Sequence, residues 1–298
     1  MNLQYVLWFL GSLVISLGLF AFMNRGKKGI FPQCLLMGVF GTIFGVVLAK
    51  LVYYLAMINF VMMYGWLESL VDVTMGTFSY YGGVAGFCLG VVLSARLTHQ
   101  KPMELLNAFA PAGVLLAALA RFGEVMLEGV GTRDMLYWEH PEHCFFPLAV
   151  SNEYGEWLYA IFMLEGLLTL VVFVLCIIYF KKQCFLRSLF YLCLLQILCE
   201  SLRTDSFTWL FVKVEQLICM LGSSGVLLVY CLKTPGVRRR WLPIVYCFLA
   251  AAVFVVLEFA FNGKIPLPQP LCYGVMVAIL AALSLNEIWS FKRMEANK

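Results

Sequence analysis

The sequence predicts an all-α protein that crosses a membrane several times. Apolar residues make up 62% of the 298 positions and charged residues only 13%, an apolar share that a soluble domain cannot cover with polar surface. The apolar residues gather in runs near the length of a spanning helix, about 20 residues. These observations favour one polytopic bundle over two soluble domains. We expect no nucleic-acid partner, because the net charge of +4 is spread over short loops.

Nine apolar runs are candidate spanning helices. The first lacks the basic start and the small-residue exit of a cleaved signal peptide, so we interpret it as a retained helix. The last two are joined by a proline-punctuated turn at 262–270. In chain order the predicted spans are residues 3–23, 31–57, 80–96, 105–127, 157–180, 187–203, 210–232, 242–261 and 269–291.

The loops between these runs alternate in charge, and this alternation predicts the orientation. One set of loops holds 15 of the 21 basic residues. The opposite set is mainly acidic, with Glu68, Asp72 and Glu153 among its members. Because basic loops stay on the cytoplasmic side, we expect the N-terminus outside and the C-terminus in the cytoplasm. An odd number of spans agrees with this orientation.

The longest outer loop, residues 129–156, is expected to form a small exported head. It carries His140, His143 and Cys144, but two histidines and one cysteine without a tight ligand spacing are weak evidence for a metal site. We therefore expect no bound metal and no cofactor. Most of the 11 cysteines lie inside apolar runs, and Cys144 has no obvious partner, so we predict no disulfide.

Charged residues within or at the ends of the apolar runs predict a polar site at one membrane level. A charge at such depth is costly and usually serves a function or has a partner. Arg121 follows Leu105, the inner start of its span, by 16 residues, which at 1.5 Å per residue is about 24 Å and reaches the outer leaflet. The same level is expected for Tyr5, Lys50, Tyr81, Glu200 and Arg203. The sequence thus predicts one site open to outer-leaflet lipid or to an exported substrate.

Two predicted helices carry their polar residues on one face. One face, spaced i, i+3, i+7, consists of Arg121, Glu124 and Glu128. The other, spaced i, i+4, i+7, consists of Gln196, Glu200 and Arg203. Facing each other, they would form a buried network with a functional role. The alternative is structural: Arg121 and Arg203 would pair with Glu200 and Glu124 only to hold the bundle together.

Four stretches of the chain, taken in order and spacing, resemble the prolipoprotein diacylglyceryl transferase family. "GTFSYYGG" (76–83) resembles its G-x-x-S-F-H-G-G, and "NAFAPAGVLLAALARFGE" (107–124) resembles its D-x-x-A-P…G-R-x-G-N signature. "QILCESLRTDSF" (196–207) and "EQLICML" (215–221) resemble its R-F-x-x-E-x-x-R block and the following G-Q-x-x-S-L. Weaker similarities are "QYVL" (4–7) and "AKLVYY" (49–54).

The resemblance implies a seven-helix transferase-like bundle at 1–232, with two additional helices at 233–298. It implies transfer of a diacylglyceryl group from phosphatidylglycerol to the lipobox cysteine of an exported prolipoprotein in the bacterial plasma membrane. The implied partners are phosphatidylglycerol, the prolipoprotein signal peptide and membrane lipids. The implied catalytic residues are Tyr81, Arg121, Glu200 and Arg203. The implied substrate contacts are Tyr5, Lys50, Gly82, Gly83, Glu124, Glu128, Gln196 and Gln216.

The chain departs from the family pattern at several of these positions. Tyr81 stands where the family has histidine, Glu124 where it has asparagine, and Gln196 where it has arginine. A tyrosine, with an ordinary pKa near 10, is a poor general base at neutral pH. A second hypothesis is therefore a non-catalytic or repurposed lipid-binding relative. A transporter-like bundle is a third, disfavoured because the charges gather at one leaflet rather than along a midplane path.

Overall fold

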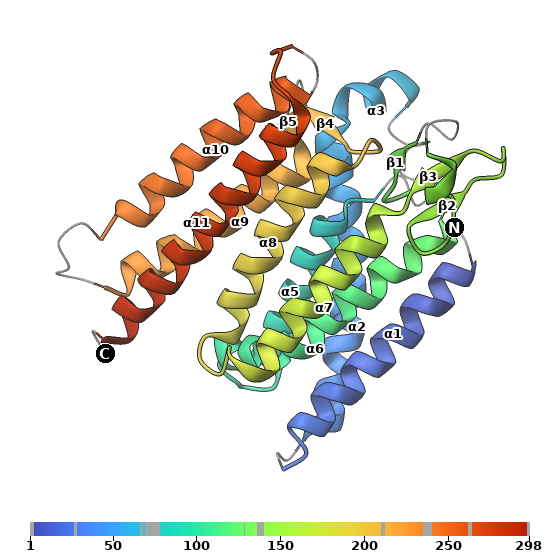
Figure 1. Ribbon diagram of the computed structural model, residues 1–298. Coiled ribbons are helices and arrows are strands. Elements are labelled where there is room, and N and C mark those ends of the chain that lie inside the picture. The colour runs from blue at the N-terminus through green and yellow to red at the C-terminus, as the bar shows by residue number, and fades with distance from the viewer. Residues whose placement is uncertain are drawn as a thin grey trace. The chain divides into compact units, whose positions relative to one another are not determined.

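The computed structural model describes residues 3–26, 29–65, 68, 78–127, 129–135, 140–209, 212–234, 240–261 and 264–296 (Figure 1). Within these residues, nine helices are long and apolar enough to cross a membrane. The prediction of an all-α polytopic membrane protein is confirmed. The nine helices are α1 (Leu3–Met23), α2 (Ile30–Ala56), α5 (Tyr80–Leu97), α6 (Pro102–Gly123), α7 (Ile161–Ile178), α8 (Cys184–Leu202), α9 (Val214–Leu232), α10 (Leu242–Phe261) and α11 (Gln269–Ala296).

Local sequence explains where several helices begin. Ser79 precedes α5, and its Oγ accepts a 3.0 Å hydrogen bond from the backbone N–H of Gly82, which satisfies one of the free donors at a helix start. Pro102 occupies the first position of α6, where a missing N–H costs nothing. The described residues also include three short helical segments: α3 (Ile58–Tyr64), η2 (Glu124–Met126) and η3 (Pro141–His143).

The fifth predicted span is wrong at its start. The sequence predicted a helix from residue 157, but Trp157–Tyr159 form strand β3, and α7 begins at Ile161. An apolar triplet fits the first turn of a helix and a short strand equally well, so periodicity could not separate them. The pairing partners, which lie elsewhere in the chain, decide in favour of the strand.

The small sheet next to α7 has the strand order β1-β3-β2 and is antiparallel throughout. Tyr159 on β3 is opposite Arg133 on β1 (Arg133–Asp134) and Ala149 on β2 (Ala149–Ser151). In Figure 1 the N-terminus of α1 lies at the same end of this part of the molecule as the sheet. A second pair of strands, β4 (Thr208–Trp209) and β5 (Val212–Lys213), forms a hairpin before α9.

The chain forms two compact units. The first unit comprises residues 1–188 and 202–207, and the second comprises residues 189–201 and 208–298. In the first unit a core is formed by side chains from α1, α2, α5 and α6, including Phe20, Met37 and Phe109. The rings of Phe20 and Phe109 meet edge to face at 5.8 Å, a favourable aromatic arrangement.

Glycines bring α2 and α5 of the first unit into backbone contact. A Cβ added at Gly86 would collide with the carbonyl of Phe44, and one added at Gly90 would collide with the backbone of Gly41. At Gly82 an added Cβ would lie 2.8 Å from the carbonyl oxygen of Leu48. Small residues that let helix backbones approach closely are a common basis of packing within membranes. The resemblance implied Gly82 as a substrate contact, and the structure shows that it also lies at this close approach of the two helices.

The second unit contains most of α8 together with α9, α10 and α11. Its packing uses larger side chains, and its most deeply buried ones include Leu227, Tyr230, Phe254 and Met276. Many of the large apolar side chains on α10 and α11 are exposed, as expected for helices that face lipid.

Candidate functional site

Arg121 is the centre of a buried polar cluster in the first unit. It lies in the last turn of α6 and is only 2% exposed. Its Nη1 lies 2.6 Å from Glu124 Oε1, and its Nε lies 2.8 Å from Glu165 Oε2. A buried arginine without partners would strongly destabilise the fold, and these two carboxylates offset the cost of burying its charge. The sequence placed Arg121 and Glu124 on one helical face, and in the structure they form an ion pair.

Arg203 and Asp205 extend the cluster from the segment after α8. Asp205 Oδ2 accepts a 2.7 Å hydrogen bond from Arg203 Nη2, and Asp205 Oδ1 accepts a 3.0 Å bond from Arg203 Nε. Arg203 Nη1 also lies 3.7 Å from Glu165 Oε1, so Glu165 lies between the two arginines. Because α8 ends at Leu202, Arg203 does not share a helical face with Glu200.

The Asp205 carboxyl has a lowered pKa. Burial by itself would raise this pKa, but the hydrogen bonds and positive charge of Arg203 outweigh burial. The backbone N–H of Gly131 also donates to Asp205 Oδ2 at 2.9 Å and favours the charged form. The arginine and the loop before β1 thus hold this carboxylate ionised.

The two carboxylate oxygens of Glu124 have different surroundings among the described residues. It lies in η2 and is 4% exposed. Its Oε1 pairs with Arg121, while its Oε2 is buried and has no hydrogen-bond partner among the residues that the structure describes. Oε2 faces Gly131, which has φ +70°, and a Cβ at that position would collide with this oxygen. A buried carboxylate oxygen without a donor is costly, so it marks a place where a ligand hydrogen or a proton would be stabilised.

Tyr80 contributes a contact that sequence reasoning missed. The Arg121 guanidinium carbon lies 3.5 Å from the centre of the Tyr80 ring, a close cation–π contact. The Tyr80 hydroxyl donates to the carbonyl of Ala117 at 2.8 Å. The predicted residue, Tyr81, is buried next to it, and the two rings meet edge to face at 5.3 Å. The sequence analysis selected Tyr81, because spacing along one helix could not show which of the two rings covers the arginine.

The start of α1 covers the end of α6. Trp8 Nε1 donates to the carbonyl of Leu119 at 2.7 Å. A Cβ added at Gly123 would collide with the Trp8 indole and would lie 3.2 Å from Tyr5 Cε2. Tyr5 therefore lies against the end of the helix that carries Arg121.

Lys50 lies among aromatic rings of the first unit. Its ammonium nitrogen is 4.9 Å from the centre of Phe78, 5.3 Å from that of Tyr53 and 5.8 Å from that of Tyr54. Three rings around one ammonium favour a cation at this position. The structure does not describe Glu128, so its predicted role falls outside the described residues.

Three predicted residues lie in a separate network of the second unit. Gln196 Nε2 donates to Glu200 Oε2 at 2.8 Å, and Lys213 donates to the Glu200 carbonyl at 2.5 Å. Gln216 donates to Glu258 Oε1 at 2.8 Å and to the carbonyl of Ile197 at 3.2 Å. Glu258 lies on α10, beyond the predicted transferase-like segment. Gln216 therefore links α9 of that segment to α10, the first of the two additional helices.

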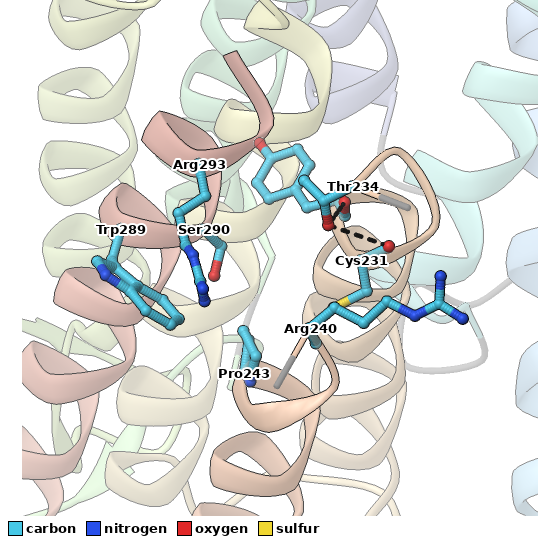
Figure 2. Close-up of a pocket in the computed structure, with 8 residues that line it drawn as sticks. Cys231, Thr234, Arg240, Pro243, Trp289, Ser290 and Arg293 are labelled. Carbon is cyan, nitrogen blue, oxygen red and sulfur yellow. Dashed lines mark hydrogen bonds between the residues drawn. The ribbon is translucent and has the colours of Figure 1, made fainter. Parts of the chain in front are cut away.

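Figure 2 shows a small pocket in the second unit, between the end of α9, the start of α10 and the end of α11. Arg293 packs its guanidinium over Trp289 at 4.0 Å. Arg240 and Arg293 extend in different directions, so they do not form one clamp for an anion. The remaining lining residues are Tyr230, Cys231, Thr234, Pro243 and Ser290.

The fold and the cluster define a multi-pass membrane protein with a buried arginine–carboxylate site. A family model described as prolipoprotein diacylglyceryl transferase matches residues 4–232, and the chain belongs to this family. The chain is similar to the phosphatidylglycerol–prolipoprotein diacylglyceryl transferase of Clostridium novyi (strain NT), with 24% identity over 154 residues. The similar region covers 49% of this chain and 59% of that relative's length.

Proposed function

We propose that this protein transfers a diacylglyceryl group from phosphatidylglycerol to the lipobox cysteine thiol of an exported prolipoprotein. It would act in the bacterial plasma membrane, with its N-terminus outside and its C-terminus in the cytoplasm. The observation that carries the proposal is the buried Arg121, which stands at the position of the family's signature arginine and pairs with Glu124 and Glu165. Arginine binds phosphate well through its planar fork.

The reaction forms one bond and breaks another. The cysteine sulfur attacks the glycerol carbon that carries the phosphate, a C–S bond forms, and the C–O bond to phosphate breaks. The electron pair leaves with glycerol phosphate, whose negative charge Arg121 and Arg203 would stabilise. The arginines lie in a carboxylate-rich cluster, so a phosphate must replace part of the Glu124 or Glu165 contact.

The thiol must lose its proton, because the thiolate is the nucleophile. We assign this proton to Glu124 Oε2, the buried oxygen for which the described residues supply no donor. Tyr81 and Glu200 remain proposed catalytic residues that shape the site. Tyr5, Lys50, Gly82, Gly83, Gln196 and Gln216 remain proposed substrate contacts, and Glu128 is proposed from the sequence alone.

The direct experiment supplies a lipobox peptide and phosphatidylglycerol vesicles to the purified protein and follows the mass increase of the peptide. Wild type should form the thioether product, and Arg121→Ala should form none. Glu124→Gln should lower the rate by about 10²–10⁴-fold, the usual contribution of a general base. Glu165→Gln is the matched control, because it removes the other carboxylate partner of Arg121 without removing the proposed base.

The transfer proposal is wrong if folded wild-type protein forms no product when both lipid and peptide are present. Rescue of a bacterial strain that lacks its own transferase provides the same comparison in cells. If Glu124→Gln and Glu165→Gln lose activity equally, the carboxylates act through the charge of Arg121, and the base assignment is wrong.

A second function, lipid binding without turnover, is favoured by one observation. Three carboxylates, Glu124, Glu165 and Asp205, already neutralise the two arginines of the cluster. In that case phosphatidylglycerol should co-purify with the protein without being consumed. The double substitution Tyr81→His and Gln196→Arg, which restores the family residues, should then gain activity that wild type lacks.

A further inference from the structure

The small head at the end of the first unit holds a cluster of metal-ligating side chains. His140, Glu142 and His143 lie on and next to η3, and one ligand atom from each lies within 4.8 Å of the others. Two of the three side chains are exposed and the third is half-buried. None of them belongs to the buried arginine–carboxylate cluster, so the mechanism proposed above does not use them.

The distances in this cluster are close to those that a metal ion requires. His140 Nδ1 lies 3.4 Å from Glu142 Oε1, and His143 Nε2 lies 3.7 Å from the same oxygen. Zinc bonds to imidazole nitrogen and carboxylate oxygen are about 2.0–2.2 Å long, so neighbouring ligand atoms in a tetrahedral site are about 3.3–3.6 Å apart. Small rotations of exposed side chains would bring all three atoms around one ion.

A tyrosine of the sheet orients one of the histidines. The Tyr159 hydroxyl lies 2.9 Å from His143 Nδ1, which leaves Nε2 to face Glu142. Tyr159 is anchored in β3, between strands β1 and β2. A hydrogen bond to the non-ligating nitrogen is the usual way in which proteins fix a metal-binding histidine. The ring planes of His140 and His143 are also nearly parallel, with an angle of 16° between them.

We propose that His140, Glu142 and His143 form a binding site for a divalent transition metal, with Zn²⁺ as the representative ion. Two imidazoles and one carboxylate suit such ions better than Mg²⁺ or Ca²⁺, which prefer oxygen ligands alone. The exposure of the cluster leaves coordination positions for water. The site is independent of the proposed transferase activity and, by the predicted orientation, faces the outside of the cell.

The experiment uses the full chain in detergent, purified with a tag that contains no histidine, and Zn²⁺ alone as the probe. Competition with a chromophoric chelator gives the affinity and the number of ions bound. Wild type should bind one ion that the double variant His140→Ala/His143→Ala does not bind. His99→Ala is the matched control, because it removes the remaining histidine and should leave that ion bound.

A separate variant tests whether Tyr159 orients His143 for metal binding. Tyr159→Phe keeps the aromatic ring in the sheet and removes only the hydroxyl, and it should weaken Zn²⁺ binding by about 10- to 100-fold. Thermal unfolding in the absence of metal should be the same for wild type and the double histidine variant, which separates lost binding from lost folding. The proposal is overturned if wild type binds no more Zn²⁺ than the double variant.

Discussion

The two units stabilise buried carboxylates in different ways. In the first unit Glu124, Glu165 and Asp205 face the guanidinium groups of Arg121 and Arg203. In the second unit Glu200, Glu258 and Glu287 each accept a hydrogen bond from an uncharged donor. Glu287, which is fully buried, accepts from the hydroxyls of Tyr191 at 3.3 Å and Tyr230 at 3.2 Å.

This difference separates buried carboxylates that an incoming anion could replace from the contacts of Tyr191 and Tyr230 with Glu287, which stabilise packing. A guanidinium that is paired with carboxylates can bind a phosphate in their place, because a carboxylate and a phosphate each offer two oxygens to its N–H groups. A phenol or an amide that donates to one carboxylate offers no positive charge to a phosphate. The comparison therefore favours the first unit as the place of phosphate chemistry.

The largest expected change in stability comes from removing the charge of Arg121, at the centre of the arginine–carboxylate cluster. Arg121→Ala leaves Glu124 and Glu165 buried without their cation, which should cost about 3–5 kcal/mol of stability. Lys101→Ala breaks an exposed ion pair with Glu104 and should cost at most about 1 kcal/mol. Thermal unfolding of both variants in detergent measures the difference. Equal effects would show that the buried pairs are not what stabilises the first unit.

The next largest change in stability is expected from glycine substitutions, which should have opposite effects in the two units. Gly86→Ala places a methyl group against the Phe44 carbonyl, so α2 and α5 must separate, at a cost of about 1–3 kcal/mol. Gly274→Ala in α11 of the second unit meets open space and should stabilise by about 0.5–1 kcal/mol, the ordinary helix preference for alanine. Thermal unfolding midpoints measure both effects. Midpoints of Gly86→Ala and Gly274→Ala that shift in the same direction from wild type would contradict the predicted difference.

A smaller effect tests the charge of Asp205. The folded-state pKa of this carboxyl is lowered, so its stabilising contribution is present above the unfolded-state pKa of about 3.9 and is lost as pH falls through the folded-state value. At pH 7, Asp205→Asn should lose about 1.5–3 kcal/mol, the usual value of hydrogen bonds to charged groups. The gap in melting temperature between wild type and variant should close below about pH 4. A gap that stays constant into acid would mean that the charge is not the cause.

The smallest effect belongs to the second unit. Tyr230→Phe removes one of the two phenol donors to Glu287 and retains Tyr191, so it should cost about 0.5–1.5 kcal/mol. Lipidation of the peptide should stay within about twofold of wild type, because Tyr230 lies outside the proposed phosphate site. Stability comes from thermal unfolding and activity from the peptide mass assay. A loss of activity comparable to that of Arg121→Ala would contradict the division between the units.

Most of the fold could be predicted from hydropathy alone. The predicted spans at 3–23 and 242–261 have the same bounds as α1 and α10. This agreement has a physical cause: a backbone in lipid must satisfy its own hydrogen bonds, so a long apolar run has few alternatives to a helix. The failure at Trp157–Tyr159 occurs outside that constraint, in the small sheet.

The candidate site was predictable in part. The spacing i, i+3 placed Arg121 and Glu124 on one helical face, and the structure shows them as an ion pair. The structural hypothesis paired Arg121 and Arg203 with Glu200 and Glu124 across two helices, but α8 ends before Arg203. Its partners are Asp205 in the following loop and Glu165 on another helix. The available signal for Glu165 was its acidic side chain inside an apolar run, one turn after the start of α7.

The sequence by itself determined that this is a multi-pass helical membrane protein, that Arg121, Glu124 and Glu200 lie within apolar runs, and which family's motifs the chain resembles. These properties depend on composition, local spacing and order along the chain. Only the tertiary structure decided that Tyr80 covers Arg121, that Glu165 lies between two arginines, and that the oxygen of Glu124 opposite Gly131 has no donor among the described residues. The physical reason is that these contacts join segments far apart in the sequence, where helix periodicity carries no information about which side chains meet.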